Sequence, residues 1–118
     1  MTTRTFSTSN PPECPVFTHL RNGTKTVEGR PYSKKYHAVK AGDVIAFRHG
    51  SSVYRAKVKS VKRYQTLQGY LRGESLRKTL PGVHSTQQAV KIYNKWSSLA
   101  QRNRLKNKFG YSMLAIRV

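Results

Sequence analysis

The chain has 118 residues, 36% of them hydrophobic, and this length and composition suit a single domain with one core. Twenty-three lysines and arginines against four acidic residues give a formal net charge of +19, which favours a polyanionic partner and above all nucleic acid. No apolar run is long enough for a membrane span and no secretory signal pattern is visible, so we expect an intracellular protein, cytoplasmic or nuclear.

The first part of the chain predicts short elements separated by turn residues. Residues 1–14 are interpreted as an N-terminal extension with a first strand at 4–9, and residues 15–118 as the single domain. Prolines at a helix start, glycines at turns and short apolar runs then indicate the order of the next elements. They are a helix, a short strand, a loop closed by a turn, and a strong strand, over residues 10–23, 24–29, 30–42 and 43–49.

The strand predicted over residues 53–64 carries much of the basic charge. Arg55 and Lys57 alternate with apolar residues, so we expect one basic face and one buried face. The alternation slips by one residue at Ser60, which indicates a bulge. The bulge would re-aim the side chains that follow it, which are Lys62, Arg63 and Tyr64.

The rest of the chain predicts two helical segments, at residues 66–82 and 85–99. In the second segment Ser85 and Gln88 form a capping box, which marks a helix start. The apolar residues at helical spacing in this segment are expected in the core, and they are Ala89, Ile92, Tyr93 and Trp96.

Residues 100–110 are interpreted as a basic connector, which carries Arg102, Arg104, Lys106 and Lys108. Residues 111–118 then predict an apolar strand that closes the sheet. Four or five strands with short helices between them predict an α+β fold built on a small curled sheet or barrel.

A charged motif stands near the start of the domain. Gly23, Lys25, Glu28 and Arg30 form the pattern G-x-K-x-x-E-x-R, followed in order by KAGDVIAF, VKRYQTL, LPG, AVKIYNKW and FGYSMLAIRV. This series resembles the ASCH family, the activating-signal-cointegrator homology domains. The resemblance implies a PUA-like β-barrel with short helices flanking a cleft, and a cleft lined by the lysine, glutamate and arginine of the motif. It also implies a role in RNA binding.

The charged motif allows two kinds of site and one simpler explanation. Glu28 and Arg30 share one face of a strand and Lys25 lies opposite, so Lys25 must sit at the bend entering the strand if all three are to meet. Glu28 would then hold both cations in fixed geometry for a phosphate or a base edge. Alternatively, Lys25 and Glu28 are catalytic, with a desolvated Lys25 as the general base of a small hydrolase. The simpler explanation is an ion cluster that only fixes the loop at residues 30–36.

Two hydrolase activities are compatible with the resemblance, but not equally. A branch of related proteins that removes the acetyl group from modified cytidine carries threonine where this chain has Glu28, and a carboxylate does not replace that hydroxyl as a nucleophile. A metal-independent ribonuclease is the better enzyme hypothesis, because it needs a base, an acid and a cation to stabilise the phosphate. Further candidates for such roles are His19, Tyr64, Glu74 and Ser112.

For binding, aromatic residues interleave with cations in a way that suits single-stranded RNA. We expect at least one of the tyrosines at positions 32, 36 and 64 to be buried instead. The predicted nucleic-acid contacts are Lys25, Glu28, Arg30, Tyr32, Lys34, Lys35, Arg55, Lys57, Lys62, Arg63, Tyr64, Arg102 and Arg104. No cofactor is predicted: the four histidines are scattered and Cys14 is the only cysteine, which leaves neither a zinc site nor an intrachain disulfide.

Overall fold

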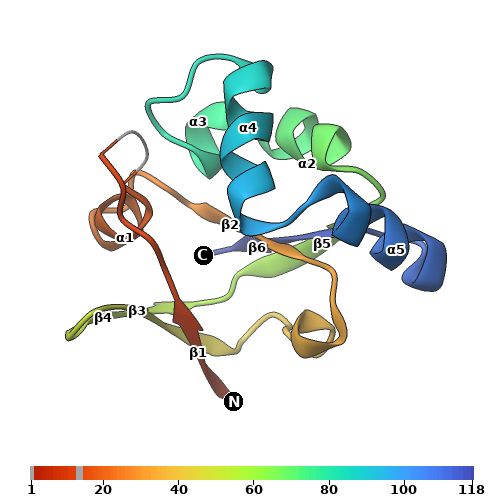
Figure 1. Ribbon diagram of the computed structural model, residues 1–118. Coiled ribbons are helices and arrows are strands. Elements are labelled where there is room, and N and C mark those ends of the chain that lie inside the picture. Colours follow the sequence, from red (N-terminus) through yellow and green to blue (C-terminus); the bar gives the residue numbers. More distant parts are fainter. Residues whose placement is uncertain (1, 13–14) are drawn as a thin grey trace.

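Six strands in two sheets, with helices against one of them, form the α+β fold that the computed structural model describes for residues 2–12 and 15–118 (Figure 1). One sheet has the strand order β1-β3-β4 and the other β2-β6-β5. The strands are β1 (Thr3–Ser7), β2 (Val27–Pro31), β3 (Val44–His49), β4 (Ser52–Lys57), β5 (Ser60–Tyr64) and β6 (Met113–Arg117). Within the described residues, strand pairing does not join the two sheets, so the predicted closed barrel is not confirmed.

The helices lie mainly on one side of the β2-β6-β5 sheet, and the β1-β3-β4 sheet lies on the other (Figure 1). They are α1 (Val16–Arg21), α2 (Leu67–Glu74), α3 (Leu76–Thr79), α4 (Thr86–Trp96) and α5 (Leu99–Phe109), with a short 3-10 turn, η1 (Lys34–Tyr36). As predicted, the side chain of Ser85 caps α4 by accepting a hydrogen bond from the backbone N–H of Gln88. In the described parts of the chain, no helix combines the length and apolar character of a membrane span.

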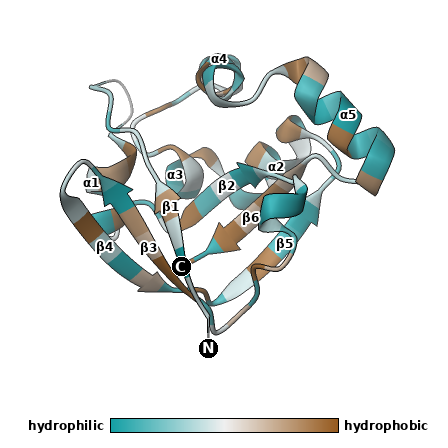
Figure 2. Cartoon of the chain, turned by 60° about the horizontal axis from the view of Figure 1, so that its bottom comes forward, coloured by the Kyte–Doolittle hydropathy of each residue, from teal (hydrophilic) through white to brown (hydrophobic). Residues whose placement is uncertain are grey.

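The segment interpreted as a basic connector is helix α5, so that prediction is wrong. The hydroxyl of Ser98 accepts a hydrogen bond from the backbone N–H of Gln101 and begins the helix. Gly110, in the left-handed conformation with a φ of 85°, ends it. Because α5 is mostly hydrophilic (Figure 2), its sequence has no clear apolar stripe to reveal it. In the sequence, only Ser98 before the helix and Gly110 after it indicate α5.

The slip at Ser60 marks a change of sheet, not the bulge that we predicted. β4 ends at Lys57 in one sheet, and β5 begins at Ser60 in the other. Between them, Val58 donates its backbone N–H to the carbonyl of Asp43, which directly precedes β3 of the first sheet, and Lys59 donates to the carbonyl of Arg117 in the second. The exposed Arg55 and Lys57 on β4 confirm the basic face of the earlier part of this segment.

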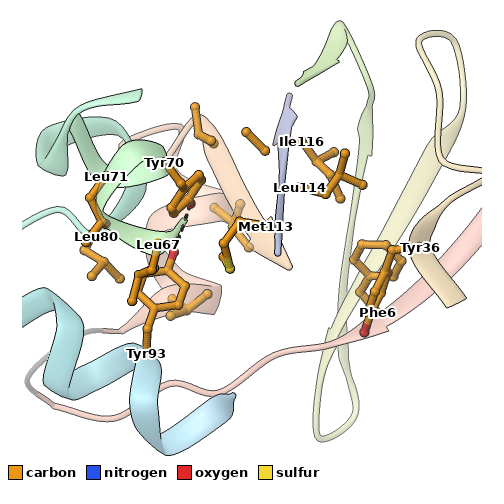
Figure 3. Packing of buried hydrophobic residues seen from close by; sticks show 14 of the residues in the cluster. Phe6, Tyr36, Leu67, Tyr70, Leu71, Leu80, Tyr93, Met113, Leu114 and Ile116 are labelled. Atoms are coloured by element: carbon orange, nitrogen blue, oxygen red, sulfur yellow. Dashed lines mark hydrogen bonds between the residues drawn. The ribbon is translucent and has the colours of Figure 1, made fainter. Parts of the chain in front are cut away.

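The core is divided by strand β6, whose side chains alternate between two apolar layers (Figure 3). Met113 lies on the side of the helices, where the hydroxyls of Tyr70 and Tyr93 share a hydrogen bond of 2.9 Å. Leu114 faces the other sheet, and so does the buried Ile116. The hydrogen bond between Tyr70 and Tyr93 ties α2 to α4, and the cleft described next opens between β2 and the end of α4.

Candidate nucleic-acid interface

The three charged side chains of the motif meet at the start of β2, and Lys25 lies at the bend before the strand, which is the arrangement that the spacing allowed. Lys25 precedes the strand and places its Nζ 3.4 Å from Oε1 of Glu28. The same ammonium donates to the backbone carbonyls of Val27, at 2.6 Å, and of Thr79. Arg30 donates through Nη2 to Oε2 of Glu28 at 3.0 Å, so one carboxylate lies between two cations.

Burial makes this cluster rigid and fixes its charges. Only 1% of Lys25 and 6% of Glu28 are exposed. Burial by itself raises the pKa of the Glu28 carboxyl, but the charges of Arg30 and Lys25 and their hydrogen bonds outweigh it and lower the pKa. Glu28 is therefore ionised, and the Lys25 ammonium directs its donors to Glu28 and two carbonyls. These contacts suit an anchoring ammonium and not a free general base.

A cleft of about 270 Å³ opens beside this cluster, between the end of β1, strand β2 and the end of α4. Glu28 and Arg30 line the cleft, and Lys25 lies behind them. Trp96 stands at the α4 side with 42% of its surface exposed, and its ring packs edge-on against Tyr93 at 5.2 Å. The prediction that Trp96 belongs to the core is therefore wrong, although Ala89, Ile92 and Tyr93 are buried as expected.

Ser97 adds an unusual group to the cleft. It lines the cleft and is only 4% exposed, yet its buried hydroxyl has no hydrogen-bond partner in the structure. An unpartnered buried hydroxyl is costly in an apolar setting, and such groups are rare in folded proteins. Sequence reasoning did not single out Ser97, because a lone serine at a helix end has no distinctive pattern.

Arg102, one of the predicted nucleic-acid contacts, lies inside the protein and holds this corner together. Only 4% of it is exposed. Its guanidinium donates to the backbone carbonyl of Ser97 and, at 2.7 Å, to Oδ1 of Asn94. Arg102 therefore fixes the junction between α4 and α5, and with it the position of Trp96, instead of presenting its charge on the surface.

The backbone of β2 also faces the cleft, because β2 is an edge strand. Just outside the ends of β2 and β6, the backbone N–H of Val118 donates to the carbonyl of Thr26, and that of Tyr32 donates to the carbonyl of Ser112, each at 2.9 Å. Since the pairing alternates along the strand, the N–H and C=O of Gly29 point away from β6, and Gly29 lines the cleft. A β-carbon at Gly29 would lie 2.3 Å from the hydroxyl of Tyr70, so glycine alone allows this close packing.

Most of the other predicted contacts lie outside the cleft. Tyr32 and Tyr36 are buried, which confirms the expectation for at least one of the tyrosines, and only Tyr36 of these two lines the cleft. Tyr64 is half-buried and donates to Glu74. The predicted contacts that are exposed cations are spread over η1, β4, β5 and α5, and they are Lys34, Lys35, Arg55, Lys57, Lys62, Arg63 and Arg104.

The remaining catalytic candidates have other partners or lie away from the cleft lining. Ser112 is buried and donates its hydroxyl to the carbonyl of Gln65 at 2.8 Å. Glu74 forms an ion pair of 2.8 Å with Arg117, and Nδ1 of His19 is buried without a hydrogen-bond partner in the structure. None of the three lines the cleft. Over residues 2–12 and 15–118, no group of three or more histidine, cysteine or acidic side chains is arranged to hold a metal ion.

Each acidic residue in the described part of the chain is buried in an ion pair. Glu28 pairs with Lys25 and Arg30, Glu74 pairs with Arg117, and Asp43 lies 3.1 Å from Arg4. The fourth acidic residue, and Cys14 beside it, lie outside the described residues, as does the predicted domain boundary at residue 14. The exposed charged side chains of the described residues are therefore all basic.

Comparison with known proteins places the fold. The crystal structure of the hypothetical protein PH0355 is similar to this chain with a TM-score of 0.77 and 27% identity, covering 99% of this chain and 96% of that one. The solution NMR structure of PF0455 from Pyrococcus furiosus is similar with a TM-score of 0.69 and 27% identity, covering 99% and 94%. No curated protein matches the chain. The sequence profile of the ASCH domain matches residues 13–117, and the chain therefore belongs to the ASCH domain family.

Proposed function

We propose that this chain is an RNA-binding ASCH domain that receives one unpaired nucleobase in the cleft between β1, β2 and α4. The observation that carries the proposal is the exposed Trp96 beside a recessed cleft, in which the carboxylate of Glu28 is already paired with two cations. An indole ring in this position provides a stacking surface for any base. The positive surface then attracts the phosphate backbone. The expected partner is a single-stranded, intracellular RNA.

The size of the cleft favours a single base. Its volume of about 270 Å³ lies just below the range of drug-sized pockets, which starts at roughly 300 Å³. The proposal also treats the two sheets, which share one apolar core, as a PUA-like barrel with incomplete strand pairing. In that arrangement the cleft is the gap between the barrel and helix α4.

Polar groups around the cleft are suited to reading the edge of a base. The ionised carboxylate of Glu28 accepts hydrogen bonds, and the backbone of Gly29 supplies one donor and one acceptor. The hydroxyl of Ser97 is buried in the wall of the cleft and joins these groups only if its side chain turns toward the base. Neighbouring groups of this kind recognise the hydrogen-bonding edge of an unstacked base.

The alternative function is a hydrolase of RNA or, less favoured, of acetylated cytidine. One observation supports it, which is the buried and unpartnered hydroxyl of Ser97 in the cleft. The predicted base, Lys25, argues against it, because its ammonium already contacts two carbonyls and Glu28. In this alternative Glu28 stabilises positive charge instead of attacking a substrate.

The decisive experiment uses Trp96, the only tryptophan of the chain, as its own reporter. Adding single-stranded RNA should quench the intrinsic fluorescence, and Trp96→Ala should weaken RNA binding measured with labelled RNA. Loss of one stacked base costs about 1–3 kcal/mol, or roughly 5- to 150-fold in affinity. The matched control is Leu99→Ala, which removes another exposed apolar side chain near the same helix junction.

Two outcomes would contradict the proposal. If Trp96→Ala binds RNA as Leu99→Ala does, and RNA leaves the fluorescence unchanged, the cleft does not hold a base. If a denaturing gel shows RNA shortened by the wild type, and Ser97→Ala leaves the RNA intact, the hydrolase alternative replaces the binding proposal. RNA that remains full-length and shifts in a native gel supports the binding function.

A further inference from the structure

A second pocket lies at the opposite edge of the same sheet. It opens beside β5, has a volume of about 370 Å³, and is lined by aromatic and basic side chains from the segment after β2, from β5 and from the start of β6. We call it the β5-edge groove and define it by Tyr32, His37, Lys62, Arg63 and Tyr111. Between the two pockets lies the segment after β2, because Pro31 and Tyr36 line the Trp96 cleft and their neighbours Tyr32 and His37 line the groove.

The aromatic wall of the groove is held in place by its own contacts. The ring of His37 stacks on Tyr32 with a centroid distance of 4.0 Å and an interplanar angle of 22°. A nitrogen of the same imidazole, Nε2, lies 3.0 Å from the carbonyl oxygen of Tyr32. Tyr111 meets Tyr32 edge-on at 5.9 Å, and Phe109 meets His37 at 4.4 Å. The wall is therefore formed before any ligand arrives, which lowers the entropic cost of binding.

The charge at the groove is positive and only partly engaged. The guanidinium of Arg63 lies 5.2 Å from the ring centroid of Tyr111. A hydrogen bond to Tyr32, together with the tyrosine hydroxyls nearby, raises the pKa of Arg63. These contacts orient the guanidinium but leave most of its donors for a ligand. The neighbouring Lys62 is exposed and holds its ammonium 5.1 Å from the ring centroid of Tyr64, and no lining residue of the groove is acidic.

This combination identifies the chemistry of the ligand. A planar guanidinium matches the oxygens of a phosphate in a bidentate manner, and a neighbouring aromatic ring provides a face for a base or sugar. A purely apolar ligand would leave the donors of Arg63 unused, and an acidic protein surface would make no use of the aromatic wall. A phosphodiester with an attached nucleoside uses both.

We propose that the β5-edge groove is a second contact for the same RNA strand, where Arg63 holds a phosphodiester and Tyr111 packs against the adjoining nucleoside. The inference rests on the proposed function and extends it. One base enters the Trp96 cleft, and the strand continues around the sheet to the groove. A dinucleotide then occupies the cleft alone, whereas a longer strand occupies both sites.

The test compares Arg63→Gln with Arg72→Gln, an identical change at an exposed arginine of α2 that lines neither pocket. Affinity is measured against salt concentration with a single-stranded RNA of about ten nucleotides, a length in the usual range for one binding domain. Arg63→Gln should weaken the binding of this RNA. It should also reduce the slope of log affinity against log salt concentration by about one unit, as loss of one phosphate contact does. Tyr111→Leu should also weaken it, and Tyr111→Phe should restore most of the affinity.

The dinucleotide separates the two proposals. Its quenching of Trp96 should be the same in the wild type and in Arg63→Gln. If the dinucleotide and the longer RNA both leave the fluorescence unchanged, the proposed function fails. If the longer RNA binds Arg63→Gln and Arg72→Gln equally, the groove is not a contact, and the function of the cleft stands. Displacement of the longer RNA by inorganic phosphate at matched ionic strength would also overturn the inference, since it would identify a site for the free anion.

Discussion

The two edges of the β2-β6-β5 sheet use charge in opposite ways. At the β2 edge, Glu28 is buried between Lys25 and Arg30, so the charges satisfy one another inside the protein. At the β5 edge, Lys62 and Arg63 are exposed beside aromatic rings and no acidic residue lines the groove. The first arrangement builds a rigid wall, whereas the second leaves donors available to a polyanion.

This comparison separates the charged motif near the start of the domain from the exposed cations that the proposal assigns to RNA binding. The lysine, glutamate and arginine of the motif are the most visible charged pattern in the sequence, yet two of them, Lys25 and Glu28, are buried. In the proposal, the attraction for phosphate comes from exposed cations such as Arg63, which lies in the later VKRYQTL segment and not in the first charged motif. Substitutions at the two edges should therefore act on different properties, stability at the β2 edge and salt-dependent binding at the β5 edge.

The largest effect is expected from Glu28→Gln. This change leaves the ammonium of Lys25 buried without a counter-charge, which costs about 3–5 kcal/mol in the free energy of unfolding. Arg63→Gln, at the exposed edge, should change the same quantity by less than about 0.5 kcal/mol. Urea unfolding of both variants measures the difference.

A second variant tests whether the buried charge is the cause. Lys25→Met combined with Glu28→Gln removes the isolated ammonium and fills its space with an apolar side chain, so it should be more stable than Glu28→Gln alone. If the double variant is less stable instead, the hydrogen bonds from Lys25 to Val27 and Thr79 matter more than its charge. Equal stability of Glu28→Gln and the wild type would remove the basis of the comparison.

Sequence reasoning located the charged cluster correctly because a simple geometric rule governs it. Glu28 and Arg30 are two residues apart on a strand, so Lys25 reaches them only from the bend before the strand, and the structure places it there. The sequence did not decide whether this cluster is buried, because a binding site at the surface and an ion cluster in the interior would have the same residue pattern. The difference depends on Thr79, which comes from a distant helix and accepts a hydrogen bond from Lys25.

The errors have physical causes as well. Trp96 follows the helical spacing of Ile92 and Tyr93, but it occupies the last turn of α4, where the core has ended and the cleft begins. Helix α5 lacks an apolar stripe, because its buried residue is Arg102 and not a hydrophobic one. Spacing predicts which side chains share a face of a helix, but tertiary packing decides how far the buried face extends.

A smaller effect is expected from Gly29→Ala, which tests the close packing behind the β2 edge. The added β-carbon would lie 2.3 Å from the hydroxyl of the fully buried Tyr70, which is tied to Tyr93 by a 2.9 Å hydrogen bond. Overpacking of this kind costs about 1–3 kcal/mol. Displacement of Tyr93 also moves the ring of Trp96 that packs on it, so RNA affinity should fall while the salt slope stays unchanged. Urea unfolding and RNA binding at several salt concentrations measure these two effects. If Gly29→Ala has the stability and the affinity of the wild type, the close packing of Gly29 against Tyr70 is not present.

The smallest effect concerns pH and follows from the lowered pKa of Glu28. Its ordinary value is 4.5, and in the folded protein burial raises it less than Arg30 and Lys25 lower it. Because the folded-state pKa lies below the unfolded one, this carboxylate contributes stability above about pH 4.5 and loses it as the pH falls through the folded-state value. Urea unfolding between about pH 5.5 and 3 should therefore show decreasing stability in the wild type.

Arg63→Gln should follow the wild-type curve, because its groove has no carboxylate, whereas Glu28→Gln should give a flatter one. Curves of equal steepness for the two variants would mean that the charge of Glu28 contributes nothing to folding, and that the β2 edge owes its rigidity to packing around Gly29 and Tyr70 instead.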